Sequence, residues 1–162
     1  MGEKDRVSAS ISIAAEPNAI FALITDLPRM GEWSPENKGG AWQGGATQAE
    51  VGARFLGNNV NAEAGKKWDV AVVVKELSEP TRFVFHTRFK GMTLAHWIYE
   101  IEPCETGCTV TETWIDTRNR ALAKALGGKI TGIPGLKRNE FTRRSIETTL
   151  ANLKQTAEAR PS

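Results

Sequence analysis

The sequence predicts one α+β domain, in which a curved antiparallel sheet and a C-terminal helix enclose an apolar pocket. Three features of the 162-residue chain support this fold class: an early strand followed by a short helix, a run of strands over 51–116, and a final helix with one apolar stripe. The length suits a single domain spanning residues 1–162, which can bury a core without disulfide cross-links.

The first quarter of the chain carries one strand signal and two helix signals. Residues 7–14 alternate apolar side chains with serines, which predicts a half-buried strand. Pro17 fits the first turn of a short helix, and the segment 29–36, which carries Trp33, predicts a second short helix or a turn. Paired glycines then mark a loop and a weak strand around Trp42.

The rest of the chain reads as strands followed by a helix. The strands are predicted near 51–59, 66–76, 81–90, 94–103 and 108–116. The helix is predicted from about 138 to 159. Its apolar stripe has 4-3-4 spacing and consists of Ile146, Leu150, Leu153 and Ala157.

The alternation of apolar and polar residues predicts how the last two strands pair, because a one-residue slip would turn every side chain over. With 104–107 as a four-residue loop, Tyr99 lies opposite Glu112 and Trp97 lies opposite Trp114. A three-residue loop would segregate the two faces less well and would bring the two cysteines together. We therefore expect both cysteines to be free thiols.

The same reasoning assigns the two upstream hairpins. A loop at 91–93 places Phe83, Phe85, Thr87 and Phe89 opposite Ile101, Tyr99, Trp97 and Ala95. A loop at 77–80 places Val74, Val72, Val70 and Trp68 opposite Phe83, Phe85, Thr87 and Phe89. On the outer face this register pairs Asp69 with Arg88 and Arg82 with Glu102.

All three hairpins predict the same inner face, which is rich in aromatic and branched side chains. Its members are Trp68, Val70, Val72, Val74, Phe83, Phe85, Phe89, Trp97, Tyr99, Val110 and Trp114. One helix stripe and a short helix pair are too little to fill so wide a face, which predicts a cavity that a ligand completes. The alternative is a fully packed core, since apolar strand faces are ordinarily core.

The composition argues against several function classes. A formal net charge of +2 gives no overall field for nucleic acid, and two histidines are too few for a dedicated metal cluster. We find no glycine-rich phosphate loop and expect no cofactor. The polar N-terminus lacks the apolar core of a signal peptide and no stretch approaches membrane-span length, which predicts a cytoplasmic protein.

Five segments resemble a known family. They are "AAEPNAIFALITDLPRMGEWSPE" (14–36), "VGARFLGNN" (51–59), "WIYEIEP" (97–103), "GCTVTETWID" (107–116) and "TLANLKQTAE" (149–158). In order and spacing these motifs resemble the START-like superfamily, also called SRPBCC, and within it the bacterial polyketide cyclase/dehydrase-like subgroup. The resemblance spans nearly the whole chain.

The resemblance implies a helix-grip fold, in which a seven-stranded antiparallel sheet wraps around a long C-terminal helix and two short helices follow the first strand. It also implies binding of hydrophobic ligands such as lipids, sterols or polyketides. Some members are cyclases, aromatases or hydrolases, so the resemblance leaves the activity open.

Glu112 and Tyr99 are the candidate catalytic residues. On the inner face, desolvation would raise the pKa of the Glu112 carboxyl, which suits a general acid or base, and Tyr99 would donate to it or polarise a substrate carbonyl. The alternative is a buried glutamate satisfied by its neighbours, without chemistry. His86 and His96 fall on the outer face, where they cannot serve the pocket.

The candidate ligand-binding residues are the large aromatic side chains of the inner face and one aromatic of the early helical segment. They are Trp33, Trp68, Phe83, Phe85, Phe89, Trp97, Tyr99 and Trp114. In the fold that the resemblance implies, Trp33 borders the pocket and would serve as a lid. Alternatively, Trp33 only covers the edge of the core.

The segment 118–144 is strongly basic, with eight lysines and arginines against Glu140. Its first part, 118–136, interleaves apolar residues with glycines, which predicts a mobile gate over the pocket mouth. Such a gate would suit an anionic amphiphile, an acyl-carrier partner or a transient membrane contact without stable insertion. The alternative is a solvated face with a few core anchors.

Three functions follow, and we favour the first. The protein carries or senses a small hydrophobic ligand, lipid- or polyketide-like. Alternatively, it is a polyketide cyclase or dehydratase that uses Glu112 and Tyr99, or a small interaction module whose cavity is closed.

Overall fold

The computed structural model describes residues 6–118, 121–133 and 138–159, and only the backbone of 121–124. The elements in chain order are β1 (Arg6–Ile13), α1 (Pro17–Ile24), η2 (Leu27–Glu32), β2 (Asn37–Gln43), β3 (Arg54–Asn61), β4 (Lys66–Ser78), β5 (Arg82–Phe89), β6 (Met92–Cys104), β7 (Gly107–Asp116), α2 (Ala121–Thr131) and α3 (Arg138–Glu158).

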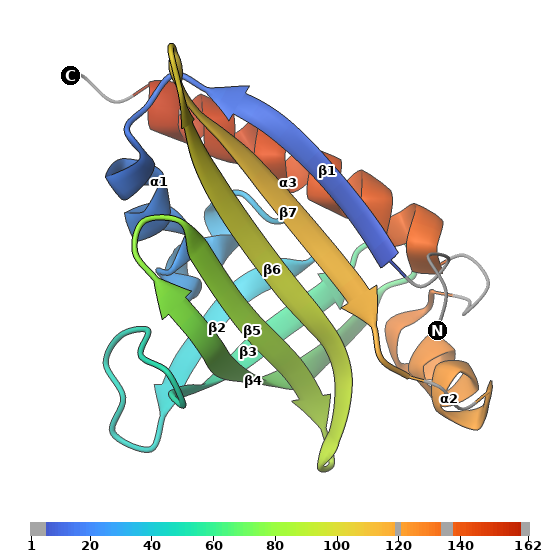
Figure 1. Cartoon of the computed structure of the whole chain (residues 1–162). Coiled ribbons are helices and arrows are strands. Elements are labelled where there is room, and N and C mark those ends of the chain that lie inside the picture. Colours follow the sequence, from blue (N-terminus) through green and yellow to red (C-terminus); the bar gives the residue numbers. More distant parts are fainter. Residues whose placement is uncertain (1–5, 119–120, 134–137, 160–162) are drawn as a thin grey trace.

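The strands form a seven-stranded antiparallel sheet in the order β1-β7-β6-β5-β4-β3-β2. The sheet curves around α3, and the short helices α1 and η2 lead from β1 at one edge to β2 at the other (Figure 1). This arrangement confirms the predicted α+β class and the helix-grip fold.

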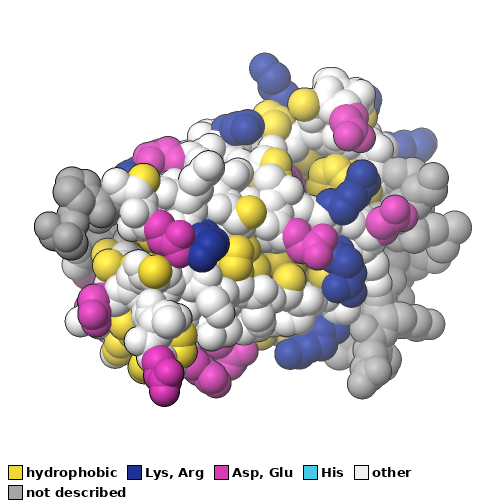
Figure 2. Space-filling view, turned by 90° about the horizontal axis from the view of Figure 1, so that it is seen from above, with side chains coloured by type: hydrophobic (Ala, Val, Ile, Leu, Met, Phe, Trp, Pro, Cys, Tyr) yellow, Lys and Arg dark blue, Asp and Glu magenta, His cyan; other side chains and the backbone are white. Residues whose placement is uncertain are grey.

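The core lies between the concave face of the sheet and the helices. All four residues of the predicted α3 stripe are buried, and each of the three larger ones contributes about 1.5–3 kcal/mol by leaving water. The apolar side of α1 is buried as well. On the face that carries α3 and β1, hydrophobic side chains are scattered among charged ones (Figure 2).

The predicted register of the last hairpin is confirmed. Tyr99 pairs with Glu112 and Trp97 pairs with Trp114 across β6 and β7. Both cysteines are free, and Cys104 pairs with Gly107 rather than with Cys108.

The registers of the two upstream hairpins are wrong by two residues up to the β-bulges and by three beside the turns, where Phe83 pairs with Leu77 and Phe89 with Met92. Phe83 pairs with Tyr99 instead of Ile101, and Val74 pairs with Phe85 instead of Phe83. The β5–β6 turn consists of Lys90 and Gly91, both with positive φ (50° and 80°), and is tighter than the predicted loop. Because a shift of two residues preserves the face, the predicted inner face is retained.

The predicted outer-face charge pairs change with the register. Arg82 pairs with Glu100 at 2.9 Å and with Glu76 at 3.0 Å, not with Glu102. Asp69 does not face Arg88; it accepts a hydrogen bond of 2.9 Å from the Asn58 amide.

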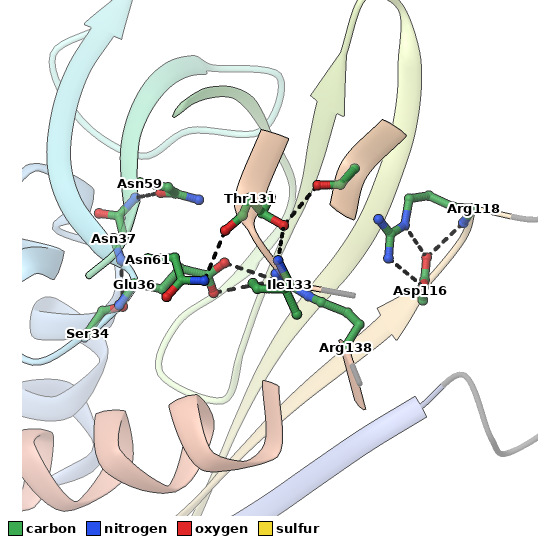
Figure 3. Close-up of polar contacts among 11 residues, drawn as sticks. Ser34, Glu36, Asn37, Asn59, Asn61, Asp116, Arg118, Thr131, Ile133 and Arg138 are labelled. Carbon is green, nitrogen blue, oxygen red and sulfur yellow. Dashed lines mark hydrogen bonds and ion pairs between the residues drawn. The ribbon is translucent and has the colours of Figure 1, made fainter. Parts of the chain in front are cut away.

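The segment predicted as a gate contains a helix, α2, which continues through two glycines. Gly132, at φ +73°, follows its last turn, and a Cβ there would lie 2.5 Å from Ala64. The Asn61 amide holds the helix end by donating to the Thr131 carbonyl at 3.0 Å (Figure 3). The mobility of this segment stays a prediction. None of the helices in the described ranges is both long and apolar enough to span a membrane.

Candidate functional site

Two neighbouring cavities lie between the concave face of the sheet and the helices. We call the larger one, of about 510 Å³, the outer chamber, and the smaller one, of about 50 Å³, the inner chamber. Both are lined by Glu36, Asn59, Val70, Thr87 and Trp97. The two chambers therefore adjoin and share part of their lining.

The outer chamber is walled mainly by apolar side chains. These are Trp68, Val70, Phe89, Met92, Leu94, Ala95, Trp97, Trp114, Leu126 and Ile130. Leu126 and Ile130 come from α2, and together with Met92 they are among the exposed large hydrophobic residues. They therefore lie at the rim of the chamber. Its volume falls in the range of roughly 300–1,000 Å³ that is typical of small-molecule sites.

The lining of the inner chamber includes nine polar residues beside apolar ones such as Met30, Phe55 and Val72. Its polar residues are Ser34, Glu36, Asn37, Asn59, Thr87, Tyr99, Glu112, Ser145 and Thr149. Several of these are tied to one another: the Asn37 amide donates to Asn59 Oδ1 at 2.9 Å, and Ser34 Oγ accepts from the Asn37 backbone at 3.0 Å (Figure 3). The polar wall is thus held in place by its own hydrogen bonds.

Glu112 and Tyr99 meet at the inner chamber. The Tyr99 hydroxyl donates to Glu112 Oε2 at 2.9 Å, and both side chains are buried. The other carboxyl oxygen, Oε1, has no hydrogen-bond partner among the described residues. Each buried polar atom of this kind calls for an explanation, because burial without a partner costs about 1–3 kcal/mol.

The environment of Glu112 favours its neutral form. Burial raises the pKa of the Glu112 carboxyl to about 8, the Tyr99 hydrogen bond opposes this shift, and the charge of Glu36 adds to it. Burial, together with the neighbouring carboxyl, also raises the pKa of Tyr99. At neutral pH the carboxyl is therefore mostly protonated, and it can donate a proton or a hydrogen bond.

A buried ion pair lies where the chambers meet. Arg138, the first residue of α3, contacts Glu36 at 3.0 Å, and their side chains are 13% and 7% exposed. The guanidinium also lies 5.5 Å from the Trp114 ring centre. A second pair, Arg118 with Asp116, is bidentate at 2.9 Å for each contact (Figure 3). Both arginines line the outer chamber with their charges already compensated.

The structure brings most of the predicted site residues together. Trp68, Phe89, Trp97 and Trp114 line the outer chamber, and Phe85, Trp97, Tyr99 and Glu112 line the inner one. Trp33 and Phe83 line neither chamber, because both are fully packed in the core at 1% and 0% exposure. The backbone carbonyl of Trp33 accepts from the Asn152 amide at 3.0 Å, which links the η2 end to α3.

Sequence reasoning missed three polar residues of the site: Glu36, Asn59 and Arg138. The Glu36–Arg138 contact joins positions 102 residues apart, and no local pattern signals it. The segment predicted as a gate does border the site, since its helix α2 contributes four residues to the outer chamber: Leu126, Gly127, Ile130 and Thr131. Lys129 is exposed, and the side chain of Lys124 lies outside the described part of the chain.

The two histidines lie on the outer face and take no part in the chambers. Their rings stack at 3.7 Å across β5 and β6. The pKa of His86 is lowered to about 4, mainly by burial and further by the nearby charges of His96, Lys75 and Arg88. Within the described residues, no three His, Cys, Asp or Glu side chains gather as metal ligands would.

Solved structures share this fold. A Polyketide_cyc-like protein from Corynebacterium glutamicum is 29% identical, with a TM-score of 0.57 over 94% of this chain and 91% of that one. The protein NE0264 from Nitrosomonas europaea is 13% identical, with a TM-score of 0.67 over 98% of this chain and 97% of that one. The di-domain ARO/CYC BexL, from the BE-7585A biosynthetic pathway, is 18% identical, with a TM-score of 0.69 over 96% of this chain and 50% of that one.

The last two likenesses concern the fold alone, and no curated protein matches the sequence. A family model described as "Polyketide cyclase / dehydrase and lipid transport" matches residues 4–158, which is nearly the whole chain. The chain therefore belongs to the polyketide cyclase/dehydrase and lipid transport family, within the SRPBCC superfamily of helix-grip proteins.

Proposed function

We propose that the protein binds a small hydrophobic ligand, lipid- or polyketide-like, in the outer chamber, and serves as its carrier or sensor. The observation that carries this proposal is the chamber of about 510 Å³ with Trp68, Trp97 and Trp114 in its wall. Aromatic walls favour a ligand with flat apolar surface, because each ring contact contributes about 0.5–1.5 kcal/mol beyond burial. A chamber of this size disfavours the alternative of an interaction module with a closed cavity.

A titration with a small aromatic probe tests this proposal. A neutral naphthyl ketone should bind the purified protein and quench its tryptophan fluorescence. Ala95, which is 4% exposed, lines the outer chamber. Ala71 is exposed on β4, on the outer face of the sheet. Ala95→Phe should weaken binding by about tenfold or more by filling the chamber, and Ala71→Phe should leave it unchanged. Equal affinity in both variants would contradict the proposal.

A second candidate function, an acid–base enzyme of the cyclase or dehydratase type, is favoured by the protonated Glu112. An acid that is neutral at pH 7 can protonate a carbonyl or a leaving hydroxyl, and Tyr99 holds it in place. In a turnover assay with a β-hydroxyketone, Glu112→Gln should abolish dehydration while circular dichroism shows an intact fold. Full activity in that variant would eliminate Glu112 as the acid.

A further inference from the structure

We propose that the ligand is an amphiphile that enters with its polar end first: a neutral oxygen acceptor, such as a ketone carbonyl, lies in the inner chamber against Glu112, and the apolar body fills the outer chamber. This inference rests on the proposed binding function and adds the orientation and the chemical class of the ligand.

The kinds of polar group in the two chambers support this orientation, since both linings are mostly apolar. The Glu112 carboxyl and the Tyr99 hydroxyl line the inner chamber and not the outer one, whereas the cationic side chains Lys90, Arg118 and Arg138 line the outer chamber and not the inner one. Three charged groups at the outer chamber already have partners: Arg138 pairs with Glu36, Arg118 with Asp116, and the Asp69 carboxylate with Asn58. A ligand therefore meets the neutral hydrogen-bonding pair of Tyr99 and Glu112 only where it reaches the inner chamber.

Glu112 supplies the specific contact. Its Oε2 accepts from Tyr99, while the buried Oε1 has no partner among the described residues although Glu112 lines the inner chamber. In the neutral acid, the oxygen that carries the proton is a donor. A ligand carbonyl in the inner chamber would accept that hydrogen bond and satisfy the carboxyl.

The charges at the inner chamber argue against an anionic tip. Its charged or titratable residues are Glu36, Tyr99 and Glu112, and among the described residues no Lys or Arg lines it. The nearest compensating charge, the Arg138 guanidinium, already contacts both Glu36 oxygens at 3.0 and 3.5 Å. A ligand carboxylate or phosphate would thus be placed beside two acidic side chains without a free cation.

The test compares three probes of similar shape at neutral pH: a naphthyl methyl ketone, the matching isopropylnaphthalene and naphthoate. The ketone should bind about tenfold more tightly than the hydrocarbon, as one hydrogen bond in an apolar site allows, and naphthoate should bind most weakly. The double variant Tyr99→Phe/Glu112→Leu removes both partners, so no phenol is left unpaired, and it should bind ketone and hydrocarbon equally. Glu112→Gln, whose amide still donates, should retain the preference.

The outcomes separate this inference from the function on which it rests. If the wild-type protein binds ketone and hydrocarbon equally, the chamber binds ligands but the polar-end-first orientation is wrong. If naphthoate binds best and Lys90→Ala removes that advantage, the charged end lies at the mouth, where Lys90 lines the outer chamber. If none of the probes binds, the proposed binding function itself fails.

Discussion

The Tyr99 hydroxyl donates a 2.9 Å hydrogen bond to Glu112 Oε2, from the position directly opposite on the neighbouring strand. The pairing of β6 and β7 fixes both residues on the concave face, and α3 covers that face. This contact occupies one carboxyl oxygen, and the other has no hydrogen-bond partner among the described residues. Several measurable consequences depend on this pair and on the ion pair beside it.

Glu112 makes the stability of the protein fall as pH rises. Its pKa is about 8 in the folded state, against an ordinary value of 4.5. Between these two pH values Glu112 is protonated in the folded protein and ionised in the unfolded chain. Its contribution to the unfolding free energy is therefore fully present below pH 4.5 and is lost as pH rises through 8. As pH rises from 4.5 to 8, the unfolding free energy of the wild type should fall relative to that of Glu112→Gln by a few kcal/mol, on the order of 5 at most.

Urea unfolding at a series of pH values measures this difference. The matched control is Glu102→Gln, since Glu102 is an exposed residue of the same hairpin. The control should follow the wild-type profile. A constant difference between wild type and Glu112→Gln across this pH range would show that the carboxyl is not desolvated.

Breaking the Glu36–Arg138 ion pair from one side should destabilise the fold. Arg138→Met leaves a buried carboxylate without its partner and should cost about 3 kcal/mol or more, because both side chains are largely excluded from water. Adding Glu36→Gln should recover much of this loss. The exposed pair Lys154–Glu158 is the control, and Lys154→Met should cost under about 1 kcal/mol. The measurement is thermal unfolding of the wild type, Arg138→Met, Arg138→Met/Glu36→Gln and Lys154→Met. An equal loss of stability in Arg138→Met and Lys154→Met would contradict the buried character of the Glu36–Arg138 pair.

His86 should stay neutral well below its ordinary pKa of 6.5, until about pH 4. A lowered pKa in the folded state means that this residue stabilises the protein above pH 6.5 and that the contribution is lost as pH falls through 4. Nuclear magnetic resonance titration of the ring protons measures it directly. His96→Gln should move the His86 pKa part of the way back, since burial remains. A wild-type midpoint near 6.5 would rule out the stacked, partly buried arrangement.

The helix α2 should open more readily than the strands β6 and β7 of the sheet. It contains Gly127 and Gly128, which weaken helical order, and it exposes Leu126 and Ile130. Amide hydrogen exchange should be faster over 121–131 than over β6 and β7. Binding of a probe in the outer chamber should slow it, because Leu126 and Ile130 line that chamber. If the amides of α2 exchange as slowly as those of β6, with or without probe, the prediction that α2 opens readily is wrong.

The sequence predicted the faces of the strands better than their pairing. Alternation has a period of two, so it rejects a slip of one residue and is blind to a slip of two. The β6–β7 hairpin has a short turn and no bulge, and its register was correct. Irregularities between Val74 and Glu76 and between Thr87 and Arg88 shift the neighbouring registers, and no local signal marks them.

The site was only partly predictable for a related reason. Glu112 and Tyr99 could be placed because they belong to one hairpin. Glu36 and Arg138 meet only when the segment after η2 reaches the start of α3, which depends on the packing of the whole domain. Trp33 was predicted beside the pocket, but it is 1% exposed and lines neither chamber. This burial depends on how η2 packs, which the spacing of residues in the sequence does not reveal.

The five tryptophans offer the most direct test of the outer chamber as a binding site. Trp68, Trp97 and Trp114 line that chamber, whereas Trp33 and Trp42 do not. The measurement is a titration of the indole N–H signals by two-dimensional nuclear magnetic resonance with the neutral naphthyl ketone. Ring-current shifts should move the three chamber signals in a saturable way and leave the other two in place. Equal movement of all five signals, or movement of Trp33 and Trp42 alone, would contradict binding in the chamber.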